Sequence, residues 1–385
     1  MRPSERAVSI QEYYFSTKLA QIREMEANGK SIINLGIGSP DLAPHTEVID
    51  VLKSEIDQPE AFKYQPYSGI EELRKEFIVW YQKEYHLKVD DLFTSIPMLG
   101  SKEALHFLAL AYLNPGDKAL IPNPGYPAYS SAIKLAGGIT VPYSLTQKNS
   151  WHPDLEELDQ LVDEHTKVIF INYPHMPTGT RGDKARLSDL LQFAKDRKVL
   201  VCNDNPYSQI LARKPFSVFQ LEDAFSTCIE LNSLSKSASM AGARIGVMSG
   251  EKSLLEPIFK IQTSFSSGMF KPLQMAAIRA LKRSKEYCKL TNQIYERRRK
   301  LVWALLDELN CDYDRAADGM FVWARFKNQK SSYEYSDQLL NQSGVFITPG
   351  EIFGTEGNGY IRVSLCVSEQ KINTAIDRIT LIQKS

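Results

Sequence analysis

The sequence has few of the residues from which disulfide frameworks and metal cages are built. Its five cysteines are scattered, odd in number and free of any CxxC pair. The six histidines are equally dispersed, and none is spaced four residues from another around a glutamate. We therefore expect reduced cysteines in the core and no structural metal.

Long hydrophobic runs and an excess of one charge are also lacking. The longest aliphatic and aromatic run, FLALAYL at 107–113, is too short to span a bilayer, and the first fifteen residues lack the apolar core of a signal peptide. Lysines plus arginines equal aspartates plus glutamates at 46 each, so no overall field draws nucleic acid or an anionic membrane. We expect a cytoplasmic protein that binds neither.

What is present is the composition of a globular protein. The chain has 385 residues, of which 43% are hydrophobic and 24% charged, with no low-complexity tract or internal repeat. This length suits two or three domains, or one large domain with a smaller one appended.

The middle of the chain alternates helical and strand patterns. Apolar residues at helical spacing predict a helix over 70–85. From about 100 to 250, helical stretches such as 186–198 alternate with five short apolar strands: KALIP at 118, KVIFIN at 167, VLVCN at 199, STCIELN at 226 and IGVMS at 245. Alternation of this kind predicts an α/β fold, with a mainly parallel sheet sandwiched by helices.

The last hundred residues have a different character. One long helix is expected from about 284, followed by GMFVWARF, a helix near 332–342, GVFIT, GYIRVSL and a final helix. We therefore expect a large domain over 46–284 and a smaller α+β domain over 285–385, to which an N-terminal segment, 1–45, contributes.

Polar side chains follow three of the predicted strands. Asn172 ends the strand KVIFIN, and Asp204 and Tyr207 follow VLVCN. The strand STCIELN runs into SLSK, which ends on Lys236. Ligands of open parallel sheets bind beyond the carboxyl ends of the strands, so these side chains are candidates for one site. Taken singly, these residues have ordinary structural interpretations: Lys236 as a solvated lysine, Asp204 as a turn or helix cap, and Tyr207 as a core tyrosine.

Two features point to the chemistry of the site. Lys236 lies among small residues, which would keep its amine out of bulk water, lower its pKa and leave it nucleophilic towards aldehydes. Gly100, Ser101 and Lys102 begin a strong helix, which is either an anion site or a plain serine N-cap. A lysine, an anion site and Asp204 together suit pyridoxal phosphate, whose aldehyde takes a lysine and whose ring nitrogen needs a carboxylate.

At this point the sequence resembles the class I/II aminotransferases of the aspartate aminotransferase superfamily, which are pyridoxal-phosphate-dependent enzymes of fold type I. The resemblance covers nearly the whole chain, and its motifs stand in the family's order: LGIGSPD at 35, YQPYSGIEELR at 64, GSKEAL at 100, LNPGD at 113, NPGYPAY at 123, NYPHMPTG at 172, NDNPY at 203, SLSKSASMAGARIG at 233, PGEIFG at 349 and YIRVSL at 360.

The resemblance implies a role for each matching residue. Lys236 would form the Schiff base and shuttle the proton, Asp204 would pair with the ring nitrogen, and Tyr207 would donate to the ring oxygen. Tyr126 would stack on the ring. The phosphate would be held by Gly100, Ser101, Lys102, Ser233, Ser235 and Arg244, and by Tyr64 from the other subunit of a homodimer.

The substrate's α-carboxylate would be bound by Arg362, with help from Asn172 and Gly38. Arginine suits this task because its planar fork binds a carboxylate bidentately. Without the neighbouring motifs, Arg362 would read as an edge-strand charge and Arg244 as a surface ion pair.

One position departs from the family. The loop usually reads N-x-P-x-N-P-T-G, and its second asparagine donates a hydrogen bond to the ring oxygen, but here that position is Met176. A thioether cannot donate, so we expect the linkage between the cofactor and the lysine to hold its proton more tightly. Alternatively, a water or His175 supplies the missing bond and Met176 only packs.

The function implied is transfer of an amino group from an L-amino acid to a 2-oxo acid. The alternatives are β-elimination on the same scaffold and a non-catalytic amino-acid-sensing domain, although a DNA-binding module has no room before LGIGSPD. A Rossmann dehydrogenase fits poorly, because the third glycine of its fingerprint is missing at 36–38. The donor is left open: a second cation would come from Arg23, Lys102, Arg181 or Lys271, and an apolar pocket from Tyr14, Phe15 or Tyr67.

Overall fold

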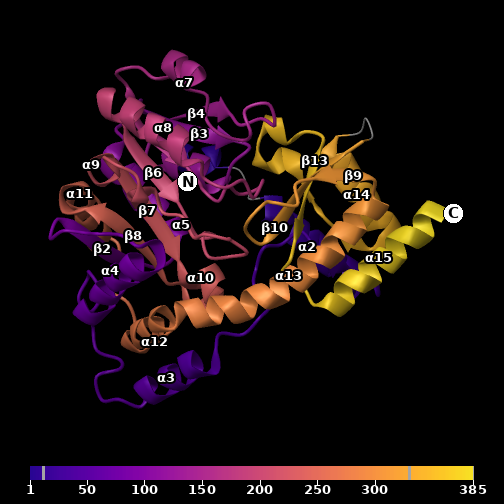
Figure 1. The fold of residues 1–385 in the computed structure, drawn as a ribbon, viewed down its shortest axis with the longest axis horizontal. Helices are drawn as coiled ribbons and strands as arrows, with labels where there is room; N and C mark the ends of the chain where they lie inside the picture. The colour runs from indigo at the N-terminus through magenta and orange to yellow at the C-terminus, as the bar shows by residue number, and fades with distance from the viewer. Residues whose placement is uncertain (11–13, 328–330, 385) are drawn as a thin grey trace.

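A seven-stranded sheet forms the centre of the larger part of the molecule (Figure 1). The computed structural model describes residues 1–10, 14–327 and 331–384. The strand order is β2-β8-β7-β6-β5-β3-β4, and only β8 runs antiparallel to its neighbours, so the predicted mainly parallel sheet is confirmed. The strands are β2 (Phe93–Met98), β3 (Lys118–Asn123), β4 (Ile139–Ser144), β5 (Thr166–Ile171), β6 (Leu200–Asp204), β7 (Cys228–Ser233) and β8 (Gly246–Glu251).

Helices cover both faces of this sheet, because its central strands are apolar on both sides. In β5, Ile169 and Ile171 enter one core, whereas Val168 and Phe170 enter the opposite one. The first core is closed by α4 (Glu71–Tyr85), α8 (Lys184–Asp196) and α12 (Lys271–Lys282). The second is closed by α5 (Ser101–Tyr112), α6 (Ala128–Leu135) and α11 (Lys252–Thr263).

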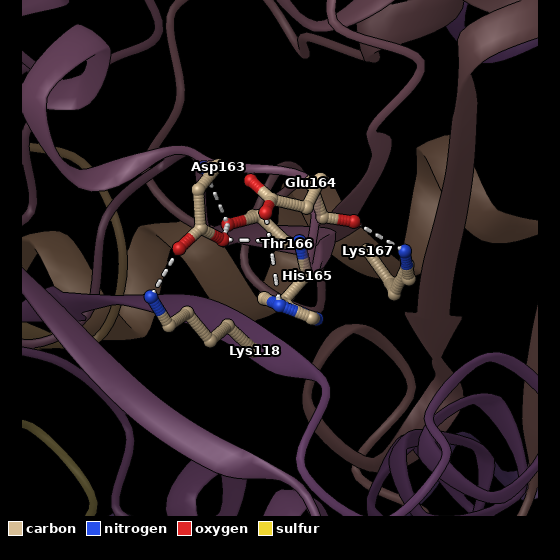
Figure 2. Close-up of polar contacts among 6 residues, drawn as sticks. All are labelled: Lys118, Asp163, Glu164, His165, Thr166 and Lys167. Atoms are coloured by element: carbon tan, nitrogen blue, oxygen red, sulfur yellow. Dashed lines mark hydrogen bonds and ion pairs between the residues drawn. The ribbon is translucent and has the colours of Figure 1, made fainter.

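A polar turn aligns the amino ends of β3 and β5 (Figure 2). The carboxylate of Asp163 accepts hydrogen bonds from the backbone of His165 at 3.1 Å and from the hydroxyl of Thr166 at 3.2 Å, and it pairs with Lys118 on β3. The backbone N–H of Lys118 donates to the carbonyl of His165 at 2.8 Å. These contacts join the start of β3 to the start of β5, and the parallel pairing continues, after a register shift between Lys118 and Ala119, to Leu120 and Ile169.

The smaller part of the molecule is a four-stranded antiparallel sheet in the order β12-β13-β10-β9. A separate parallel pair joins β1 of the N-terminal segment to β11, so the two ends of the chain meet here. The long helix α13 (Ser284–Glu308) runs from the larger part to the smaller one (Figure 1). The elements are β1 (Ile33–Asn34), β9 (Cys311–Tyr313), β10 (Phe321–Phe326), β11 (Val345–Phe346), β12 (Thr348–Pro349) and β13 (Tyr360–Ser364), with α2 (Tyr14–Ala27), α14 (Ser332–Ser343) and α15 (Glu369–Lys384).

The remaining helices are short or peripheral: α1 (Glu5–Ser9), α3 (Thr46–Ile56), α7 (Leu155–Leu161), α9 (Ala224–Thr227) and α10 (Leu234–Ser237). Within the described ranges, no helix is both long enough and apolar enough to cross a membrane. The exact domain boundaries, 1–45, 46–284 and 285–385, stay a prediction.

Candidate functional site

A pocket of about 530 Å³ opens where β5, β6 and β7 end and the smaller part of the molecule begins. Its lining contains twelve of the fourteen residues to which the resemblance assigns a role: Gly38, Ser101, Lys102, Tyr126, Asn172, Asp204, Tyr207, Ser233, Ser235, Lys236, Arg244 and Arg362. Two others lie outside the lining. Gly100 lies directly behind it, and the Tyr64 side chain is 92% exposed.

Lys236 is presented by the short helix α10, which follows β7 directly. Ser233 caps this helix: its hydroxyl accepts from the N–H of Ser235 at 3.1 Å and donates to the carbonyl of Ile245 at 3.2 Å. The Lys236 amine donates a hydrogen bond to the carbonyl of Gly38. Burial lowers the pKa of this amine, with smaller effects from nearby Cys366, which opposes the shift, and Arg362, which favours it. Lys236 is therefore poised to be a neutral base or nucleophile.

Asp204 is a buried carboxylate that lacks one partner. The hydroxyl of Tyr129 donates to Oδ2 at 3.2 Å, while Oδ1 has no hydrogen-bond partner among the described residues. Burial raises the pKa of Asp204 to about 7. A buried acceptor without a donor is costly, and a protonated ring nitrogen would satisfy it. This orphaned oxygen fits the pyridinium of pyridoxal phosphate.

The N-terminus of α5 forms the other end of the pocket. Its N-cap, Gly100, has a φ of +87°, and a Cβ placed on it would lie 2.2 Å from Nη2 of Arg244. Glycine is thus required for the arginine to approach the helix start. Arg244 is held by the carbonyls of Leu99 and Ala241 at 3.3 and 3.1 Å. The N–H groups at the start of a helix and this guanidinium suit a phosphate group.

Arg362 projects from β13, and its guanidinium is nearly fully buried. Its central carbon lies 3.9 Å from the ring centre of Phe321 and 4.6 Å from that of Phe353. Nη2 donates to the carbonyl of Gly36 at 2.9 Å, and Nη1 lies 3.2 Å from Sδ of Met176. The rings and the backbone fix the plane of the guanidinium, which is the condition for bidentate binding of a carboxylate.

The loop after β5 is held by its own polar groups. The amide nitrogen of Asn172 donates to the carbonyl of Asp204, and its oxygen accepts from the N–H of Met176 at 2.6 Å. Asn172 thus fixes the loop, a task that the sequence alone does not indicate. Both ring nitrogens of His175 are hydrogen-bonded, to Thr178 at 2.8 Å and to the carbonyl of Pro124 at 3.1 Å. The alternative that His175 replaces the missing asparagine is therefore wrong.

Several lining residues had no clear signal in the sequence. Tyr129 lies one helical turn after Tyr126, a spacing that could have revealed it. Phe321 could not be found, because its contact with Arg362 depends on the register of β10 against β13. Phe353 lies in the PGEIFG motif, but its contact with Arg362 depends on the packing of the short helix Gly350–Phe353. From α2 and the segment after it come Ser16, Leu19 and Ile37, together with Phe15, one of the candidates from the sequence for an apolar pocket. The other candidates for the donor side chain, Arg23, Arg181, Lys271, Tyr14 and Tyr67, lie outside the lining.

Comparison with known proteins supports this architecture. Residues 30–379 match the family model described as aminotransferase class I and II. Proteins named LL-diaminopimelate aminotransferase are similar over the full length. One from Halothermothrix orenii is 33% identical over 381 residues, which are 98% of each chain, and one from Dehalococcoides mccartyi is 33% identical over 387 residues, which are 100% of each chain.

Solved structures agree with the sequence comparison. The substrate-bound structure of BacF from Bacillus subtilis superimposes with a TM-score of 0.94 at 32% identity, over 99% of this chain and 98% of that one. A mutant aspartate aminotransferase from Thermus thermophilus gives a TM-score of 0.91 at 25% identity, over 99% of this chain and 100% of that one.

Proposed function

The chain belongs to the class I and II aminotransferases, which depend on pyridoxal phosphate, and we propose that the pocket around Lys236 is its active site. The reaction of this family moves an amino group from an L-amino acid to a 2-oxo acid. One observation carries the assignment of the site. The orphaned oxygen of buried Asp204 shares a pocket with the buried amine of Lys236 and the fixed guanidinium of Arg362.

The residues present can hold each part of the cofactor. Asp204 would keep the ring nitrogen protonated, the hydroxyl of Tyr207 would bind the ring oxygen, and Tyr126 would cover the ring. Ser101, Lys102, Ser235 and Arg244 would bind the phosphate, and the Ser233 hydroxyl orients α10. When bound, pyridoxal phosphate supplies an electron sink that acidifies the α-carbon proton of the amino acid.

Lys236 moves that proton. Its lowered pKa favours the neutral form of the amine, which is the form that can take the proton from the α-carbon of the substrate. The carbonyl of Gly38 orients the amine, and the close packing of Gly38 against Phe321 leaves no space for a side chain there.

Arg362 orients the substrate. Its planar guanidinium binds the α-carboxylate and thereby sets the direction of the α-carbon proton. We assign Asn172 to the same task indirectly, because it holds the loop that carries Met176 against Arg362.

We further propose that the amino donor carries an apolar or aromatic side chain. Phe15, Leu19 and Ile37 bring apolar surface to the pocket, and Phe321 and Phe353 add two rings. Within the described part of the chain, Asp204 is the one carboxylate of the lining, so the second ammonium group of a diamino acid finds no counterion in it. LL-diaminopimelate is the second candidate, because the similar proteins are named for it.

We infer a homodimer from an exposed aromatic surface formed by Phe62, Tyr64, Phe265 and Phe270, which are 79%, 92%, 68% and 37% exposed. The rings of Phe62 and Phe270 lie 5.4 Å apart, and a Cβ on Gly268 would lie 2.5 Å from the carbonyl of Gln65, so the two loops adjoin. An apolar surface of this kind favours a partner, and a second copy would bring Tyr64 towards the neighbouring site.

A product assay tests the function. The enzyme, loaded with pyridoxal phosphate, is given phenylalanine, leucine or LL-diaminopimelate with a 2-oxo acid acceptor. We expect the 2-oxo acid to be converted to its amino acid fastest when phenylalanine or leucine is the donor, and no ammonia to be released. Faster reaction with LL-diaminopimelate would overturn the donor assignment, and ammonia in place of a new amino acid would indicate β-elimination.

A further inference from the structure

The loop over 172–182 lines two hollows. Asn172 and Met176 reach the catalytic pocket, whereas Pro174, Arg181 and Gly182 line a second hollow of about 700 Å³. The two linings have no residue in common. The walls of the second hollow come from 84–86, 174–184, 213–220 and Asp318.

Positive charge dominates this second hollow. Arg181, Lys184, Arg213 and Lys214 line it, against the two carboxylates Glu84 and Asp318. Asp318 pairs with Arg181 at 2.7 Å, whereas Glu84 accepts a hydrogen bond from the neutral hydroxyl of Ser284 at 2.6 Å and keeps its charge. The four cations therefore exceed the two carboxylates by two charges.

Among the described residues, the other three cations form no ion pair, although the charge of Arg213 acts on Asp318 and opposes the rise of the Asp318 pKa that burial causes. In the ranges that the structure describes, no carboxylate lies within 4.0 Å of the charged nitrogens of Lys184, Arg213 or Lys214. Like charges gathered around one concavity repel each other and raise the local positive potential. A ligand with several negative charges would relieve that repulsion.

The backbone that carries these cations is anchored. The amide of Asn205 donates to the carbonyl of Phe216 at 2.8 Å, which fixes the segment after Lys214. The carboxylate of Asp183 caps α8 by accepting from two backbone N–H groups at 3.0 and 3.1 Å, which fixes the start of the helix at Lys184. Phe216, Pro174 and Pro215 supply an apolar part of the wall.

We propose that this hollow binds a small polyvalent anion, carrying phosphate groups or several carboxylates. The arginines offer planar forks and the lysines compact charges, and both kinds of donor bind either ligand chemistry. The site is separate from the catalytic pocket, so the proposal stands whichever amino donor the enzyme uses.

The test is calorimetric titration of the full chain, loaded with pyridoxal phosphate so that its own phosphate site is filled. Inorganic pyrophosphate and citrate are titrated separately, at one fixed ionic strength near the physiological value. We expect one ion of at least one kind to bind per chain. Binding of pyrophosphate alone identifies a phosphate ligand, and binding of citrate alone identifies a polycarboxylate.

Two double variants with equal loss of charge locate the site. Arg213→Ser with Lys214→Ser removes two exposed cations of the hollow, and Lys134→Ser with Lys252→Ser removes two exposed cations elsewhere. We expect the first pair to weaken binding at least tenfold and the second to change it less than twofold. Exchange of Arg213 for Lys and Lys214 for Arg should retain binding, which excludes a folding defect as the cause. Absence of binding by both anions, or equal effects of the two double variants, would overturn the proposal.

Discussion

Sδ of Met176 lies 3.2 Å from Nη1 of Arg362, and both side chains are buried. In the family that this chain resembles, an asparagine at the methionine position donates to the ring oxygen of the cofactor. Here the side chain packs instead against the residue assigned to the substrate carboxylate. Because sulfur is a weak acceptor, a carboxylate can displace this contact at little cost. Met176 therefore links the departure from the family motif to substrate binding.

Met176→Asn should lower the pKa of the linkage between the cofactor and Lys236. The new amide N–H would donate to the ring oxygen, which then holds the shared proton less tightly. Met176→Leu keeps the shape without a donor and should leave this pKa within a few tenths of a unit. Visible absorption measured across pH gives the value for each variant. An unchanged or higher pKa in the asparagine variant would show that Met176 does not set the electronics of the site.

Arg362→Lys should raise the KM for amino donors by roughly 10- to 100-fold, because a lysine cannot make the bidentate contact and a charged hydrogen bond contributes about 1.5–3 kcal/mol. The absorption of the bound cofactor should not change. Arg325→Lys is the matched control, since Arg325 is exposed on the neighbouring strand β10. Equal KM values for the two variants would show that Arg362 does not bind the substrate.

Asp204 should make the cofactor-free protein less stable as the pH rises from about 4 to about 7. Burial raises the pKa of its carboxyl from 3.8 to about 7, so over this range the folded state keeps a proton that the unfolded state has lost. The free energy of unfolding then falls by at most about 1.4 kcal/mol per pH unit. The midpoint of thermal unfolding, compared with that of Asp204→Asn at each pH, measures this effect. Parallel curves for the two proteins would contradict it.

Tyr64 should act on the site of the second subunit. In the homodimer proposed above, Lys236→Ala and Tyr64→Ala should each impair every site of their own dimers. A mixed dimer has one site with an intact Lys236 and an intact Tyr64 from the other chain. Activity should therefore rise when the two variants are unfolded, mixed and refolded together. No recovery, with mixed dimers demonstrated by mass spectrometry, would place Tyr64 outside the site.

Much of the fold could be predicted because its signals are local. The strands β5, β6 and β7 are apolar runs that end in breakers, and the polar residues at their ends lie together as expected. The edge strands β2 and β4 could not be found in the same way. β2 reads FTSIPM and β4 reads ITVPYS, so each mixes polar residues and a proline with its apolar residues, and neither shows the continuous apolar run of β5.

The site was predictable where a motif carries the chemistry, and unpredictable where packing does. Lys236, Asp204 and Arg362 stand in recognisable motifs. The rings that fix Arg362 are set by tertiary structure: Trp323 on β10 pairs with Arg362 on β13, which brings Phe321, two residues away, over the guanidinium. The free oxygen of Asp204 likewise depends on the burial of a strand end, which the sequence shows only as an apolar run.

The first measurement is the visible absorption spectrum of the purified protein, with and without an amino donor, because it tests whether Lys236 holds pyridoxal phosphate. After addition of pyridoxal phosphate, we expect a visible band that bleaches when phenylalanine or leucine is added without any 2-oxo acid. The same band should be absent from Lys236→Ala under the same conditions. A wild-type protein without this band, or one whose band is identical to that of Lys236→Ala, would show that Lys236 does not bind the cofactor.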